Sequence, residues 1–196
     1  MRLLVTNAHT PQAYAIVRAL RPHAERVVAT WEGEGRLAGL AHASWSRAVD
    51  ARYHVPSVVA DWTAGRLLGD PTPAEVAWVD ALVLVCERER IDTIFPSWDL
   101  YVFALSKHRA RFAALGVTVP VPPFDVAETA LDKYKTVLAG EAVGFPCPRT
   151  SLYESPTQLE RIASDEAFPL VIKPRFTSGG HGMAIVRNRD ELLDTA

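Results

Sequence analysis

The chain has 196 residues and a formal net charge of −2, a length that fits one large domain or one and a half ordinary ones. This balance of charge offers no basic surface for nucleic acid and no polybasic patch for a membrane. No apolar run approaches the roughly 18 residues of a membrane-spanning helix, and the opening residues lack the apolar region of a signal peptide. We therefore expect a cytoplasmic protein without a nucleic-acid or membrane partner.

The first half alternates short apolar runs with stretches of helical periodicity. This order predicts the start of a parallel, doubly wound α/β sheet. The expected strands are 3–6, 26–30, 52–55 and 92–95, and the expected helices are 11–20, 71–90 and 100–115. In the second of these helices the predicted buried face carries Val76, Val79, Leu82 and Val83.

A proline-rich stretch, 117–123, separates two parts of different character. Three prolines in four positions make it stiff and unable to pair fully within a sheet. We place the domain boundary here, between residues 1–120 and residues 121–196.

The second part begins with a predicted helix from Asp132 to Gly144. Two further helices are expected, one capped by Ser155 and one beginning at Asp190, with a β-hairpin between them. The first helix is expected to direct four side chains toward a core: Tyr134, Val137, Leu138 and Val143.

The hairpin is the most informative stretch, because a lysine, Lys173, ends its first strand just before a loop rich in glycine. Such a loop can direct successive backbone amides at one phosphate group. Only four of the 21 basic residues are lysine, so a lysine here suggests a need for a compact ammonium group. The alternative is that the glycines only make the turn.

Lys133 is the second cationic candidate, since it would lie in the first turn of a helix capped by Asp132. The helix dipole disfavours a cation there, and a bound anion would remove that penalty. The alternative is an exposed lysine balanced by Asp132.

The first half offers weaker candidates. His9 follows the first strand, at the edge of the sheet where ligands of such folds bind, although a turn or capping role is the simpler interpretation. Ser97 and Asp99 occupy the equivalent place after a later strand, where the alternative to a substrate pocket is a helix N-cap. The two cysteines, Cys86 and Cys147, lack ligand spacing and predict neither a disulfide nor a metal site.

With both lysines placed, the chain resembles the ATP-grasp superfamily, most closely its carbamoyl-phosphate-synthase large subunit and biotin carboxylase branch. The stretch from Phe168 to Pro174, followed by Ser178 to Gly182, is similar to the family's glycine-loop signature, and only Arg175 departs from its usual small residue. The Asp132-Lys133 pair with the turn from Gly144 to Pro148 resembles a second landmark.

The resemblance implies a fold and a site. The fold is α/β: a pre-ATP-grasp, Rossmann-like parallel sheet domain followed by the first, partial α+β lobe of an ATP-grasp domain. The residues implied to contact ATP are Lys133, Lys173, Ser178, Gly179, Gly180, His181, Gly182 and Met183. The ligands for Mg²⁺ are expected in a second lobe downstream, and no catalytic residue is assigned.

By the same resemblance, the complete protein is expected to be a ligase. It would activate a carboxylate or bicarbonate as an acyl phosphate for attack by an amine, and it would be a possible homodimer. Two alternatives stay open. In one, the chain is a nucleotide-binding module without turnover. In the other, it is a sheet protein that binds another small molecule and in which the hairpin is purely structural.

Overall fold

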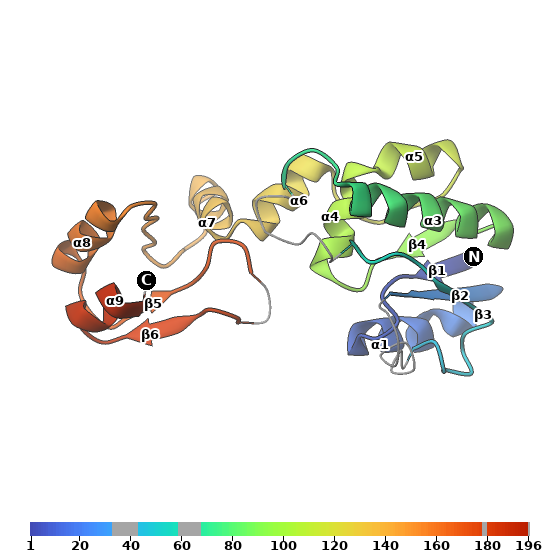
Figure 1. Cartoon of the computed structure of the whole chain (residues 1–196), viewed down its shortest axis with the longest axis horizontal. Coiled ribbons are helices and arrows are strands. Elements are labelled where there is room, and N and C mark those ends of the chain that lie inside the picture. Colours follow the sequence, from blue (N-terminus) through green and yellow to red (C-terminus); the bar gives the residue numbers. More distant parts are fainter. Residues whose placement is uncertain (33–42, 59–67, 178–179, 196) are drawn as a thin grey trace. The chain divides into compact units, whose positions relative to one another are not determined.

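The structure is a computed structural model that describes residues 1–32, 43–58, 68–177 and 180–195. It divides into two compact units, Met1–Ala127 (unit 1) and Glu128–Ala196 (unit 2) (Figure 1). Each unit is described separately. The domain assignment made from the sequence stays a prediction.

Unit 1 is a parallel sheet with strand order β3-β2-β1-β4. Residues beyond β4 extend this edge through a parallel bridge between Thr93 and Thr118. The strands are β1 (Arg2–Val5), β2 (Arg26–Trp31), β3 (Ala51–His54) and β4 (Thr93–Phe95). The helices are α1 (Pro11–Leu20), the short 3-10 helix η1 (Arg21–His23), α3 (Pro73–Glu89), α4 (Asp99–Lys107) and α5 (Arg109–Ala114).

Alternation along the strands gives the sheet two buried faces. Leu4 packs into a cluster with residues of α3 and α4, whereas its neighbours Leu3 and Val5 pack into a second cluster with residues of α1. Successive side chains of a strand point to opposite faces, so helices cover the sheet on both sides, with α1 and α3 on opposite faces in Figure 1. This is the doubly wound arrangement that the sequence predicts.

Two details of the helices differ from the sequence prediction. The single helix expected over 100–115 is two helices that meet at His108, whose imidazole lies 3.1 Å from the buried carboxylate of Glu75. Val76 was expected in the buried face of α3 but is 37% exposed, and Trp78 is fully buried instead. Periodicity alone thus misassigns two features: the helix break at His108, which contacts Glu75, and the buried face of α3, where Trp78 is buried in place of Val76.

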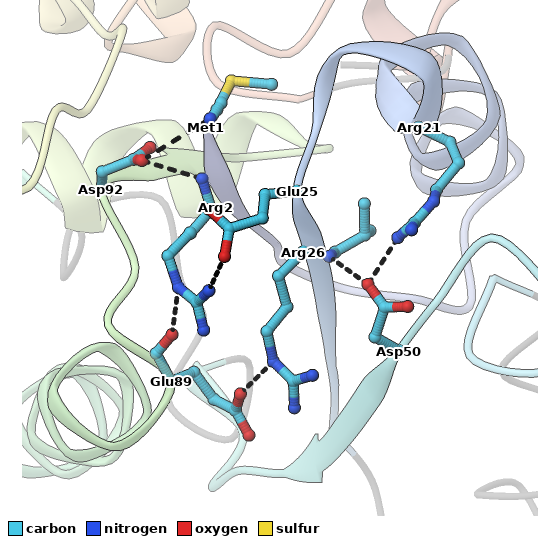
Figure 2. A network of polar contacts seen from close by, with 9 residues as sticks. Met1, Arg2, Arg21, Glu25, Arg26, Asp50, Glu89 and Asp92 are labelled. Carbon is cyan, nitrogen blue, oxygen red and sulfur yellow. Dashed lines mark hydrogen bonds and ion pairs between the residues drawn. The ribbon is translucent and has the colours of Figure 1, made fainter.

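Ion pairs join the amino-terminal ends of the strands (Figure 2). Arg26 at the start of β2 lies 2.5 Å from Glu89 at the end of α3. Asp50, just before β3, accepts from the backbone N–H of Val27 at 2.8 Å and from Arg21 at 2.5 Å. These polar groups hold together the amino-terminal ends of the strands. Other residues lie at the opposite, carboxyl-terminal ends of the strands.

Unit 2 packs a β-hairpin against two helices. The hairpin is the one that the sequence predicts, and its antiparallel strands pair Leu170 with Val186 and Ile172 with Ala184. The core of the unit consists of Leu159, Ala163, Val186 and Leu192. The strands are β5 (Leu170–Ile172) and β6 (Ala184–Val186), and the helices are α7 (Lys133–Ala142), α8 (Pro156–Asp165) and α9 (Arg189–Thr195).

The helix α7 corrects a further expectation. Its bounds agree with the sequence prediction, but none of its residues is buried; Leu138 is 45% exposed, and Val143 beyond its end is 82% exposed. Tyr134 and Val137 are only partly covered. The core of unit 2 forms from the hairpin, α8 and α9, so the apolar stripe of α7 contributes little to it. A short helix that the sequence did not predict, α6 (Phe124–Leu131), precedes α7.

Candidate functional site

The start of α7 is fixed by one carboxylate. Asp132 is 1% exposed, and its Oδ1 accepts hydrogen bonds from the backbone N–H groups of Tyr134 at 3.0 Å and Lys135 at 3.2 Å. This is N-capping, in which a side-chain oxygen satisfies amides that have no partner inside the helix. The cap places Lys133 at the first helical position.

The other oxygen of Asp132 binds Arg175, which follows β5. Its Oδ2 accepts from Nε at 2.9 Å and from Nη2 at 2.7 Å. Burial by itself would raise the pKa of Asp132, but the hydrogen bond and charge of Arg175 lower it below the usual value. Arg175, the residue that departs from the family pattern, therefore ties the start of α7 to the segment after the first hairpin strand.

Lys133 makes a second connection between the same two segments. Its ammonium group donates to the carbonyl oxygen of Thr177 at 2.5 Å and to the hydroxyl oxygen at 3.3 Å. Its backbone N–H also donates to the carbonyl oxygen of Arg175 at 3.3 Å. The cation therefore lies against residues that come directly before the glycine-rich loop.

Lys173 stands at the end of β5 and is exposed. The side chains of the strand alternate, because Leu170 and Ile172 pack against the core while Val171 is 54% exposed. Among the residues that the structure describes, none forms a hydrogen bond or ion pair with the ammonium group of Lys173.

The glycine-rich loop closes with a turn in which the N–H of Met183 donates to the carbonyl oxygen of Gly180 at 3.3 Å. Gly182 has a φ of +70°, and a Cβ there would lie 2.6 Å from Cγ of Pro174, so glycine is required on both counts. His181 and Met183 are exposed. Two predicted site residues, Ser178 and Gly179, lie outside the described residues.

The groups that could serve an anion here are lysine side chains and the backbone near the glycine-rich loop. Lys133 contacts Thr177 and Lys173 follows β5, whereas the amides at the start of α7 are already occupied by Asp132 and Arg175. Over residues 1–32, 43–58, 68–177 and 180–195, no group of three or more His, Cys, Asp or Glu side chains is placed to hold a metal ion.

The structure places the three candidate residues of unit 1 in different local settings. Ser97 is not an N-cap, because Trp98 holds that position in α4. The buried hydroxyl of Ser97 instead donates to the carbonyl oxygen of Thr6 at 2.9 Å, which joins the ends of β1 and β4. Asp99 is in the first turn of α4. His9 lines a cavity, and burial lowers the pKa of its imidazole.

That cavity contains residues that sequence reasoning missed. It measures about 350 Å³ and includes Glu32 and Tyr101 in its lining. Glu32 comes directly after β2, but it opens a stretch of weak periodicity, which hid it. Its position at the carboxyl end of a predicted parallel strand was the one signal that could have identified it.

Part of the chain is similar in sequence to known proteins. Residues 132–196 match the family model described as the carbamoyl-phosphate synthase L chain, ATP binding domain. The chain is 28% identical over 135 residues to the carbamoyl phosphate synthase large chain of Vibrio cholerae. It is 32% identical over 130 residues to that of Methanospirillum hungatei. The matched regions cover 64% and 63% of this chain but only 12% of either relative.

Solved structures with the same fold cover nearly the whole chain. The biotin carboxylase domain of the 2-oxoglutarate carboxylase of Hydrogenobacter thermophilus superposes with a TM-score of 0.67 at 20% identity, over 98% of this chain and 39% of that one. N5-carboxyaminoimidazole synthetase from Staphylococcus aureus gives a TM-score of 0.62 at 9% identity, over 99% of this chain and 42% of that one. These likenesses show the fold.

Across the described part of the chain, no helix is both long enough and apolar enough to span a membrane.

Proposed function

We propose that unit 2 binds the phosphate groups of ATP, because residues 132–196 match the family model described as the carbamoyl-phosphate synthase L chain, ATP binding domain, and the chain resembles ATP-grasp proteins of the carbamoyl-phosphate synthase and biotin carboxylase type. Lys133 and Lys173 supply the positive charge, and the backbone of residues 178–183 supplies amide donors.

The observation that carries this proposal is the contact of Lys133 with Thr177. It brings a cation from the start of α7 to the segment between Lys173 and the glycine-rich loop. An ammonium group has three donors, so Lys133 can exchange one of its present bonds for a phosphate oxygen and still keep a bond to Thr177. The amides at the start of α7 are used within the protein, which leaves the lysines and the loop as the donors for an anion.

We propose that the complete protein is an ATP-dependent ligase that activates a carboxylate or bicarbonate as an acyl phosphate, which an amine then attacks. The relatives named carbamoyl phosphate synthase large chain and the neighbour solved with MgADP and bicarbonate support this class of reaction. The lysines position the phosphate chain and offset charge on the transferring group. Mg²⁺ would accompany the nucleotide.

Mg-ATP titration of the protein with single lysine variants tests the nucleotide site. Lys173→Gln and Lys133→Gln are expected to weaken binding at least tenfold, because each removes one of two cations beside the phosphates. Lys135→Gln is the matched control: it changes a lysine of the same helix whose ammonium group pairs with Glu128 at 2.7 Å.

Thermal unfolding gives the second measurement. A ligand that binds only the folded state at about 100 times its dissociation constant stabilises that state by about 2.7 kcal/mol. If Mg-ATP does not raise the melting temperature, or if Lys173→Gln binds as tightly as the unchanged protein, the site is wrong.

Turnover is tested by ADP release in the presence of bicarbonate and a panel of small carboxylic acids with amines. Release that depends on both substrates supports the ligase. Tight Mg-ATP binding without release across the panel would instead favour a nucleotide-binding module. We also propose that the complete protein is a homodimer, since a structural neighbour is a biotin carboxylase domain dimer. Light scattering on the protein in solution measures its mass and tests this proposal.

A further inference from the structure

The cavity in unit 1 lies at the carboxyl edge of its sheet, away from the ion pairs that join the other edge. Residues that follow β1, β2 and β4 contribute to it, and the strand order changes direction between β1 and β4. Open α/β sheets bind ligands at such switch points. At about 350 Å³ the cavity suits a small ligand, near the lower limit for ligand sites. Its lining includes Asn7, His9, Glu32, Ser57, Trp98 and Tyr101.

Glu32 gives the cavity its charge. The side chain is 4% exposed, and its two oxygens accept hydrogen bonds from the indole N–H of Trp78 at 3.0 Å and from the hydroxyl of Tyr101. Both donors are neutral. The described lining residues include no lysine or arginine, so within the part of the chain that the structure describes this carboxylate has only neutral hydrogen-bond donors.

A second buried glutamate in the same unit shows the usual solution. Glu75 is 1% exposed, and Lys107 and His108 lie 3.2 Å and 3.1 Å from its oxygens. These partners lower the pKa of Glu75 despite its burial. Burial instead raises the pKa of Glu32 to about 7, although its two hydrogen bonds lower it. Buried carboxylates are normally paired, and Glu32 is the exception at a cavity.

The other lining groups add acceptors and aromatic rings. Asn7 is 3% exposed, and its Oδ1 is a buried acceptor with no hydrogen-bond partner among the described residues. Its φ of 54° places it in the left-handed region. The rings of Trp98 and Tyr101 have centroids 6.2 Å apart, and aromatic faces attract cations. Acceptors, a carboxylate and rings together favour a cation that donates hydrogen bonds.

We infer that this cavity binds a small primary ammonium ion, with the carboxylate of Glu32 as its counter-ion and Asn7 as a further acceptor. A primary ammonium matches the site better than a quaternary one, because it supplies N–H donors for Oδ1 of Asn7, which has no donor among the described residues, and for the remaining lone pairs of the Glu32 carboxylate. The site belongs to unit 1 and requires no nucleotide, so it stands or falls separately from the ATP site of unit 2.

The titratable groups in the lining are His9, Glu32 and Tyr101. Glu32 attracts an ammonium ion only when its carboxyl group is ionised, and His9 repels the ion when its imidazole is protonated. Both groups therefore strengthen binding as the pH rises. Burial and the neighbouring Glu32 raise the pKa of Tyr101, which keeps it neutral. With Glu32 titrating at about 7, affinity is expected to rise about tenfold between about pH 6 and about pH 8.

The test uses n-butylammonium chloride as the probe and the indole N–H signal of Trp78 as the reporter, since that group bonds directly to Glu32. The protein is labelled with nitrogen-15, and Trp78→Phe assigns the signal. We expect the probe to shift this signal, to bind at least tenfold more tightly than uncharged 1-butanol, and to bind more tightly than tetramethylammonium. Sodium chloride at the same ionic strength controls for screening.

Two variants separate the role of Glu32 from folding. Glu32→Gln keeps the shape and is expected to weaken n-butylammonium binding at least tenfold and to remove the part of the pH dependence that comes from Glu32, leaving only the contribution of His9. Gln12→Lys changes an exposed residue of the lining. By adding a competing cation, it is expected to weaken binding even if Glu32→Gln fails to fold.

Three results would overturn the inference. They are equal binding of 1-butanol and n-butylammonium, unchanged binding in folded Glu32→Gln or in Gln12→Lys, and no shift of the Trp78 signal up to about 100 mM probe, well above millimolar affinity.

Discussion

Replacing Arg175 with Met tests whether the start of α7 and the segment after β5 form one structural element. The change keeps most of the aliphatic stem and removes the guanidinium group. Asp132, only 1% exposed, then loses its bonds of 2.9 Å and 2.7 Å to Arg175 and keeps only the two bonds from backbone amides.

The expected loss is about 2 kcal/mol of the free energy of unfolding of unit 2. Breaking a fully buried ion pair costs about 3–5 kcal/mol, but the Arg175 side chain is 31% exposed, so solvent screens part of the interaction. Hydrogen bonds to charged groups contribute about 1.5–3 kcal/mol. For a domain of this size, each kcal/mol lowers the melting temperature by about 4–8 °C, which gives about 8–16 °C here.

The distribution of tryptophan makes the assay specific to one unit. All five tryptophans lie between residues 31 and 98, so tryptophan fluorescence follows unit 1, while circular dichroism at the helix band follows both units. Arg175→Met is expected to lower the transition seen only by circular dichroism. Arg149→Met is the matched control: it removes an arginine that is 78% exposed and pairs with Glu166 at 3.1 Å, a contact worth less than about 1 kcal/mol.

The effect of Arg175→Met on stability is expected to depend on pH. Since Arg175 holds the pKa of Asp132 below its ordinary value, the stabilisation is present above about pH 4 and is lost as the pH falls through the folded-state pKa. The two proteins should therefore converge in acid. A circular-dichroism transition that Arg175→Met leaves unchanged, or a double-mutant cycle with Asp132→Asn that gives a coupling below about 0.5 kcal/mol, would refute the reasoning.

Three further outcomes are expected. Gly182→Ala should weaken Mg-ATP binding at least tenfold in calorimetry without moving the tryptophan transition, because its Cβ would lie 2.6 Å from Pro174; unchanged affinity would remove the turn from the site. Glu75→Gln should lower the free energy of unfolding of unit 1 by about 2 kcal/mol in fluorescence-detected urea titration, because the 3.2 Å pair with Lys107 is lost, and an unchanged midpoint contradicts this. Raising the pH from about 5 to about 8 should destabilise unit 1 through Glu32 by about 2–3 kcal/mol, because its pKa rises from 4.5 to about 7 on folding and the native state binds more protons in that window. This loss should be absent in Glu32→Gln, and an equal pH slope in that variant refutes it.

Local signals predicted most of the fold. Ser155 caps α8 as expected from the sequence, and Thr10 and Thr72 cap α1 and α3 in the same way. A cap of this kind needs only neighbours in sequence. The alternation of Leu170, Val171 and Ile172 is likewise local. The resemblance to the ATP-grasp family is confirmed as well, over residues 132–196, while the assignment of individual ATP contacts stays a prediction.

Contacts between distant residues account for what the sequence did not predict. Nothing near Arg175 in the chain indicates that its partner is Asp132, 43 residues earlier. His108, where the helix breaks, contacts Glu75, 33 residues away. Periodicity records which side chains are apolar, but it does not record which charged groups meet once the chain has folded.

Asp132 and Glu32 show how such meetings decide the use of a carboxylate. Both are almost fully buried, at 1% and 4% exposure, so burial raises the pKa of each. Arg175 outweighs that effect at Asp132, where the charge is satisfied inside the protein and serves to hold α7 against the hairpin. At Glu32 the partners among the described residues are two neutral donors beside a cavity. The first carboxylate is thus committed to structure, and the second keeps its capacity to attract a cation from outside.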